Sequence, residues 1–81
     1  MNSETVHAMV LRDEIYRILA GQDPKTQSAV IADLLATWLA GHVVRGDRLK
    51  TDRLRADLLR DHINAVRVLV NINAQEMGTD E

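Results

Sequence analysis

The segment from Thr26 to Val44 carries one formal charge in nineteen residues, the carboxylate of Asp33, while both flanking segments are rich in Arg, Lys, Asp and Glu. A helix with so few charges cannot keep one face in water, so something must cover it nearly all round. A membrane is the wrong cover, because a carboxylate near mid-bilayer costs about 2.5 to 3.5 kcal/mol on insertion scales. We therefore expect a largely enclosed helix and no membrane partner.

The chain length limits how much of this covering one molecule can supply. We expect its 81 residues to form a single helical domain over 1–81, a size at which only about 60 to 65% of the unfolded surface is buried. Such domains usually need a metal, a disulfide or a partner. The chain has no cysteine, which removes disulfides and thiolate metal sites and leaves self-association.

Composition adds little about function. A net charge of −2 indicates neither a polyanion nor an anionic membrane as partner. The N-terminal residues lack a basic stretch followed by an uninterrupted apolar run, so we expect no signal peptide and a cytoplasmic protein. Arg outnumbers Lys eight to two, which is typical of a GC-rich bacterial or phage genome.

A first helix is predicted over about 4–20. Ser3 is a candidate N-cap, and Gly21 is expected to stop the helix in a left-handed conformation. Asp13 and Arg17 are spaced as an i,i+4 ion pair. The inward stripe would consist of Ala8, Leu11, Ile15, Ile18 and Leu19.

A second helix is predicted over about 24–44. Asp23 followed by Pro24 is the clearest boundary, because Asp accepts from free amides and Pro at the first helical position loses no needed donor. Gly41 could end the helix early, but Gly46 followed by Asp47 is the stronger stop and restart signal. One half of this helix is lined by Val30, Ile31, Leu34, Leu35, Trp38 and Leu39, and the other half carries Ala29, Ala32, Ala36 and Ala40.

A third helix is predicted over about 48–75, with Asp47 or Thr51 as its N-cap. One alternative concerns residues 66–73, where β-branched side chains alternate as in a strand that a dimer could exchange. We favour the helix, because the helical period continues and no turn residue precedes this segment. The tail 78–81 is expected to be frayed.

The third helix is long enough to project beyond its neighbours. Its predicted length is about 38 to 44 Å, against about 32 Å for the second helix, and short connections make neighbouring helices antiparallel. The simplest cover for the apolar overhang is the same strip of a second subunit around a two-fold axis, giving a homodimer or small homo-oligomer. The predicted interface consists of Leu58, His62, Val66, Leu69, Val70, Ile72 and Met77.

The three histidines, His7, His42 and His62, are the candidate metal ligands. No HxxxH or ExxH spacing places two ligands on one helix face, and His62 falls some 20 Å along the third helix, apart from the other two. We therefore expect no metal site and no cofactor, and keep His-based metal or pH sensing through His42 and His62 as an alternative.

Three arginines, Arg53, Arg60 and Arg67, repeat every seven residues along the third helix. They could form a phosphate-contacting stripe in a DNA-associated regulator. Four aspartates interleave with the seven basic residues of 45–67, which is typical of a self-paired, solvated face. Nucleic-acid binding is therefore the second hypothesis.

No catalytic constellation is present in the sequence. Ser3 and Ser28 are the only serines, and no spacing pairs either with a base. The four glycines are scattered and form no phosphate loop. We expect an all-α fold, a three-helix antiparallel hairpin or bundle with a long third helix that homodimerisation completes. We expect that it is not an enzyme and that it acts as a protein-interaction module such as an adaptor, inhibitor, chaperone or assembly factor. A further protein partner is allowed by the same surfaces.

Overall fold

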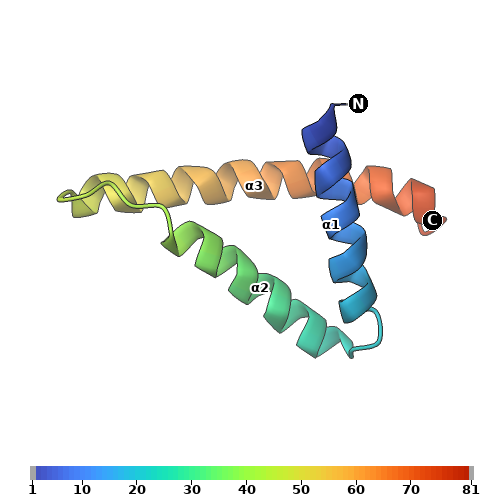
Figure 1. Cartoon of the computed structure of the whole chain (residues 1–81). Helices are drawn as coiled ribbons and strands as arrows, with labels where there is room; N and C mark the ends of the chain where they lie inside the picture. Colours follow the sequence, from blue (N-terminus) through green and yellow to red (C-terminus); the bar gives the residue numbers. More distant parts are fainter. Residues whose placement is uncertain (1, 81) are drawn as a thin grey trace. The chain divides into compact units, whose positions relative to one another are not determined.

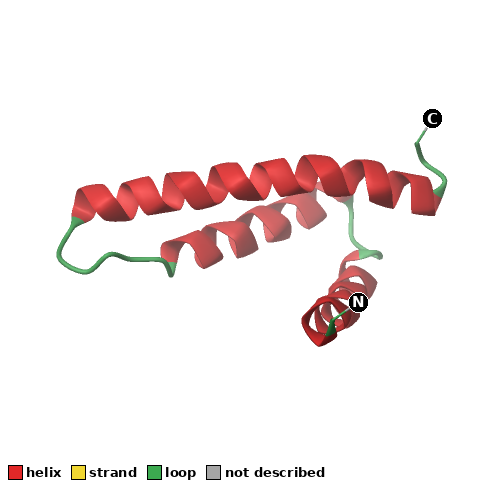
Figure 2. Cartoon of the chain, turned by 90° about the horizontal axis from the view of Figure 1, so that it is seen from above, coloured by secondary structure: helices red, strands yellow, loops and turns green. Residues whose placement is uncertain are grey.

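The computed structural model describes residues 2–80 and consists of three helices in chain order (Figure 1). They are α1 (Ser3–Leu19), α2 (Pro24–Ala40) and α3 (Arg48–Met77). Within the described residues there is no strand, and turns and short loops join the helices (Figure 2). The prediction of an all-α fold is confirmed.

Helix α3 runs without a break through residues 66–73, so the alternative of an exchanged strand is wrong. The helix ends at Gly78, which adopts a left-handed φ of 74°. The amides of Gly78 and Thr79 donate to the carbonyl oxygens of Gln75 and Ala74 at 3.2 and 2.8 Å, which is a Schellman-type end. The predicted frayed tail therefore starts with an ordered cap at Gly78, while Glu81 lies outside the described residues.

The ends of α1 differ from the predicted ones. Asn2, not Ser3, is the N-cap, and its side chain accepts from the Thr5 amide at 2.8 Å. At the other end, α1 stops at Leu19, and its C-cap Ala20 has a right-handed conformation. Gly21 does not have the positive φ that was predicted for it.

The partner of Asp13 in α1 also differs from the predicted one. Asp13 pairs with Arg12 at 3.0 Å, not with Arg17 one turn on. Both side chains of this pair are largely exposed, so it contributes little to stability.

Helix α2 begins at Pro24 and ends at Ala40, four residues before the predicted end at Val44. Asp23 supplies the N-terminal cap, since its carboxylate accepts from the Thr26 amide at 2.9 Å and from the Thr26 hydroxyl at 3.2 Å. Gly41 is the first residue after the helix, which makes it the effective stop signal and leaves residues 41–47 as the connection to α3.

The described chain divides into two compact units at the middle of α2, after Leu34. In the first unit, the Gln27 side chain donates to the Leu19 carbonyl oxygen at 2.8 Å and so joins the start of α2 to the end of α1. The second unit contains the last turns of α2, the connection and α3. Apart from His7, the candidate functional residues predicted from the sequence all lie in this second unit.

Within residues 2–80, no hydrophobic side chain is fully buried, and Thr51 is the one buried residue. In α2, only Leu35, Leu39 and the polar Gln27 reach even partial burial. The enclosure of the second helix stays a prediction.

Candidate functional site

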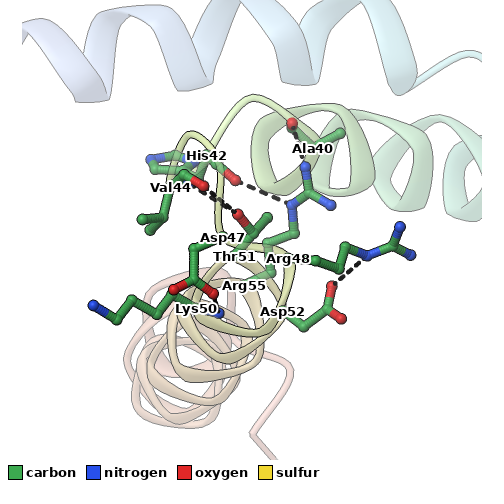
Figure 3. A network of polar contacts seen from close by, with 9 residues as sticks. All are labelled: Ala40, His42, Val44, Asp47, Arg48, Lys50, Thr51, Asp52 and Arg55. Atoms are coloured by element: carbon green, nitrogen blue, oxygen red, sulfur yellow. Dashed lines mark hydrogen bonds and ion pairs between the residues drawn. The ribbon is translucent and has the colours of Figure 1, made fainter.

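The joint between α2 and α3 is built around the guanidinium of Arg55. Its Nε donates to the His42 carbonyl oxygen at 3.1 Å and its Nη2 donates to the Ala40 carbonyl oxygen at 2.9 Å (Figure 3). The last carbonyl groups of a helix have no partner within that helix, and a cation there also meets the negative end of the helix dipole. Arg55 therefore caps α2 from the second turn of α3.

The hydroxyl of Thr51 fixes the next part of the connection. It accepts from the Val44 amide at 2.9 Å and donates to the Val44 carbonyl oxygen at 3.1 Å, and Thr51 is only 5% exposed. Both backbone groups of Val44 are thus satisfied by one side chain (Figure 3). A buried polar group costs little when its hydrogen bonds are complete.

The turn into α3 is set by Gly46 and Asp47. Gly46 adopts a φ of 77°, which side chains with a Cβ rarely adopt. Asp47 then acts as the N-cap of α3, its side chain accepting from the Lys50 amide at 2.9 Å. Of the two N-cap candidates, the structure therefore uses Asp47 and leaves Thr51 to bind the connection.

Trp38 gathers two of the three histidines. The His42 ring stands edge-on to the indole with centroids 5.0 Å apart, and the His62 ring lies 5.6 Å from it at a tilt of 43°. His42 Nδ1 lies 2.8 Å from the Trp38 carbonyl oxygen. A hydrogen bond here requires a proton on Nδ1, because a carbonyl oxygen only accepts. The predicted separation of His42 from His62 is thus wrong.

The metal hypothesis gains little from this proximity. No group of three or more His, Asp or Glu side chains lies together among residues 2–80, and a protein zinc site takes three or four such ligands. His7 lies on α1, in the first unit. Within one chain, His42 and His62 are aromatic neighbours of Trp38.

The candidate interface residues follow α3 from the joint to its C-terminal end. Leu58 is half-buried near the joint, and His62 contacts Trp38. Beyond them, Val66, Leu69, Val70, Ile72 and Met77 are 43 to 63% exposed. Between His62 and Met77 the helix carries two formal charges, those of Arg67 and Glu76.

The arginine stripe of α3 has mixed surroundings. Arg60 pairs with Asp57 at 3.3 Å and with Asp61 at 3.6 Å. Among residues 2–80, Arg53 and Arg67 take part in no ion pair. An arginine that already has two carboxylate neighbours is a weaker phosphate ligand, since the phosphate must compete with both.

The roles of Arg55 and Thr51 were not predicted from the sequence. Arg55 is one of the seven basic residues of 45–67, and Thr51 was predicted only as an alternative N-cap. One signal was present in the sequence, because the last turn of α2 has no basic residue. Carbonyl groups left in this way need donors from elsewhere, and the start of the following helix is the nearest source.

Comparison with protein-family models, with curated proteins and with solved structures gives no match to this chain. No helix within residues 2–80 is long and apolar enough to cross a membrane.

Proposed function

We propose that this protein is a small helical interaction module that works as a homo-oligomer, with the C-terminal half of α3 as the contact between subunits. The observation that carries the proposal is the exposure of this half-helix in a chain that buries none of its described hydrophobic side chains. Exposed apolar surfaces of this extent mark contact sites in soluble proteins. Its role would be binding, as an adaptor, inhibitor, chaperone or assembly factor.

The size of the surface supports a second copy as its cover. Six apolar side chains with on the order of 80 Å² accessible on each present about 500 Å², and a stable interface buries about 800 Å² per partner. The flanking alanines and side-chain stems supply the remainder. These six side chains are Val66, Val68, Leu69, Val70, Ile72 and Met77.

The shape and charge of the half-helix support the same partner. From Ile63 to Met77 four of the six polar side chains, Arg67, Asn71, Asn64 and Gln75, occupy an arc of about 80° when each residue turns the helix by about 100°. The other two, Asn73 and Glu76, lie among the apolar positions. The apolar arc is too broad for one two-stranded seam. Arg67 lies on the polar side, so Glu76 is the one formal charge among the apolar positions from 63 to 77. A two-fold axis makes one patch serve both subunits.

Nucleic-acid binding and metal sensing have less support. The nucleic-acid reading needs a free stripe, but Arg60 already has two aspartate neighbours. The metal reading needs a third ligand beside His42 and His62, and no such group lies near them among residues 2–80. Neither reading explains the exposed apolar half-helix.

Sedimentation equilibrium over a range of concentrations tests the proposal. We expect wild-type protein to have about twice the 9.1 kDa chain mass, or a small multiple of it. Leu69→Asp and Val70→Asp should weaken association about 100-fold or more, because each buries an unpaired carboxylate at the contact.

Asn71→Asp is the matched control, since it adds the same charge one or two residues away on the polar arc. It should associate like wild type. Leu69→Ala provides a milder change if the aspartate variants do not fold. A wild-type protein that stays monomeric, or variants at 69 and 70 that associate normally, would refute the proposed contact.

A further inference from the structure

The self-association strip consists of Val66, Val68, Leu69, Val70, Ile72 and Met77. A second surface of α3 lies about 120° around the helix from the middle of this strip. It is an open depression of about 350 Å³ lined by Ala56, Leu59, Arg60, Ile63, Asn64 and Arg67. These positions are spaced three and four residues apart, so they share one helix face. Leu59 and Ile63 form its apolar floor, and Ile63 is 42% exposed.

One edge of this depression is basic. Arg60 and Arg67 belong to its lining, and Arg53 continues the same edge because seven residues make nearly two helical turns. Arg53 and Arg67 form no ion pair with any described residue. The pairs of Arg60 with Asp57 and Asp61 are largely exposed. An acidic partner, like a phosphate, must compete with both aspartates, but breaking these exposed pairs costs little stability.

A second copy of this chain does not fit this face. Treating Ala56 and Ile63 as core positions of a seven-residue repeat places Arg53, Arg60 and Arg67 at the flanking position that contacts the partner helix. In an antiparallel pair the same flank meets itself, so Arg opposes Arg. In a parallel pair the other flank supplies Arg48, whose side chain is 88% exposed, and Arg again opposes Arg. Like charges across an interface are unfavourable.

Nucleic acid fits this face less well than a protein does. A phosphate backbone satisfies arginines but offers no apolar surface to cover Leu59 and Ile63. An acidic helix with an apolar face would cover the floor and pair with the edge together.

We propose that this arginine-edged face is a docking site for an acidic amphipathic helix of a different protein. The inference rests on the proposed interaction function and names the chemistry of its hetero-partner. Apolar side chains three and four residues apart would enter the depression from the partner helix, and Glu or Asp along one flank would pair with Arg53, Arg60 and Arg67. The self-association strip stays free to hold a second subunit.

Two synthetic helical peptides test the proposal by fluorescence anisotropy with the full chain. Both carry Leu at the seam positions, and they differ only in Glu or Lys at the flanking positions. We expect wild-type protein to bind the Glu peptide at least about tenfold more tightly than the Lys peptide, with a preference that falls as salt rises. A triple variant, Arg53→Glu, Arg60→Glu and Arg67→Glu, should prefer the Lys peptide.

A second triple variant, Arg17→Glu, Lys25→Glu and Arg45→Glu, makes the same change in net charge outside α3 and should keep the wild-type preference. The proposal is overturned if neither peptide binds, if both bind equally, or if the two triple variants behave alike. Tight binding of duplex DNA that only the α3 variant loses would assign the face to nucleic acid instead.

Sedimentation of the same samples separates the two proposals. An oligomeric wild type that ignores both peptides refutes the docking site and leaves the self-association strip in place. A wild type that is monomeric while it binds the Glu peptide refutes the self-association strip and supports the docking site.

Discussion

Arg55 donates a 2.9 Å hydrogen bond to the carbonyl oxygen of Ala40, the last residue of α2, although fifteen positions separate the two in the chain. Together with the bond from Arg55 to His42, it ties the end of one helix to the second turn of the next. This tie holds Trp38 near α3, where it contacts His62.

Arg55→Ala should lower the free energy of unfolding by about 1 to 3 kcal/mol, because two carbonyl groups lose a charged donor. Arg55→Lys should recover only part of this loss, since an ammonium cannot span both carbonyl oxygens in a fixed plane. Chemical denaturation measures the change. Arg53→Ala removes an arginine half a turn away that makes no such bond, and should cost less than about 0.5 kcal/mol; equal losses at positions 53 and 55 would contradict the capping role.

Thr51→Val keeps the side-chain shape but removes the hydroxyl that satisfies both backbone groups of Val44. We expect a loss of about 1 to 3 kcal/mol, because buried polar groups are left without partners. Faster hydrogen exchange of the Val44 amide would show that the loss is local. Thr51→Ser should retain most of the stability, and Thr37→Val, at an exposed position of α2, should be nearly neutral.

Gly46→Ala should destabilise the protein by about 1 to 2 kcal/mol, because the φ of 77° brings a Cβ too close to the following carbonyl oxygen. Gly21→Ala is the matched control, since Gly21 has no positive φ and open space around it, and it should be neutral or slightly stabilising. Thermal unfolding followed by circular dichroism measures both. Equal effects at the two glycines would show that the left-handed turn at Gly46 is not needed.

The cap at the start of α2 should make the free energy of unfolding depend on pH in the acid range. Hydrogen bonds from the Thr26 amide, and then from its hydroxyl, hold the pKa of Asp23 below its usual value of 3.8. A carboxyl whose pKa is lowered on folding stabilises the protein above pH 3.8, and that contribution is lost as pH falls through the folded-state pKa. Asp23→Asn cannot titrate, so the stability difference between wild type and this variant should shrink as pH drops from 5 to 2. A difference that stays constant over this range would contradict the cap.

The sequence predicted the helices well where local chemistry decides them. Asp23 and Pro24 mark the start of α2, and the continuous helical period carried α3 through the β-branched residues 66–73. The end of α2 was predicted four residues too late, because Gly46 was the stronger stop signal in the sequence. The helix ends at Ala40, directly before Gly41, and Gly41 does not adopt a left-handed conformation.

The joint was harder to predict, because it depends on where α3 folds back along α2. Nothing in the spacing of His42 and His62 shows that one indole contacts both. The capping role of Arg55 likewise depends on a contact between residues far apart in the chain. The candidate interface, in contrast, was predicted from the sequence, because the C-terminal half of α3 contains few charged residues.

The contact between two copies of α3 can be measured directly with a spin label at Asn71→Cys, because the chain has no other cysteine and every dipolar coupling must then be between molecules. The label lies on the polar arc, beside the self-association strip. If α3 pairs with α3, the two labels should lie within about 30 Å, since the helix is about 45 Å long and packed helices are 8 to 10 Å apart. The coupling should disappear when Leu69→Asp is added. Absence of coupling in the wild-type background, or its persistence with Leu69→Asp, would contradict the α3 contact.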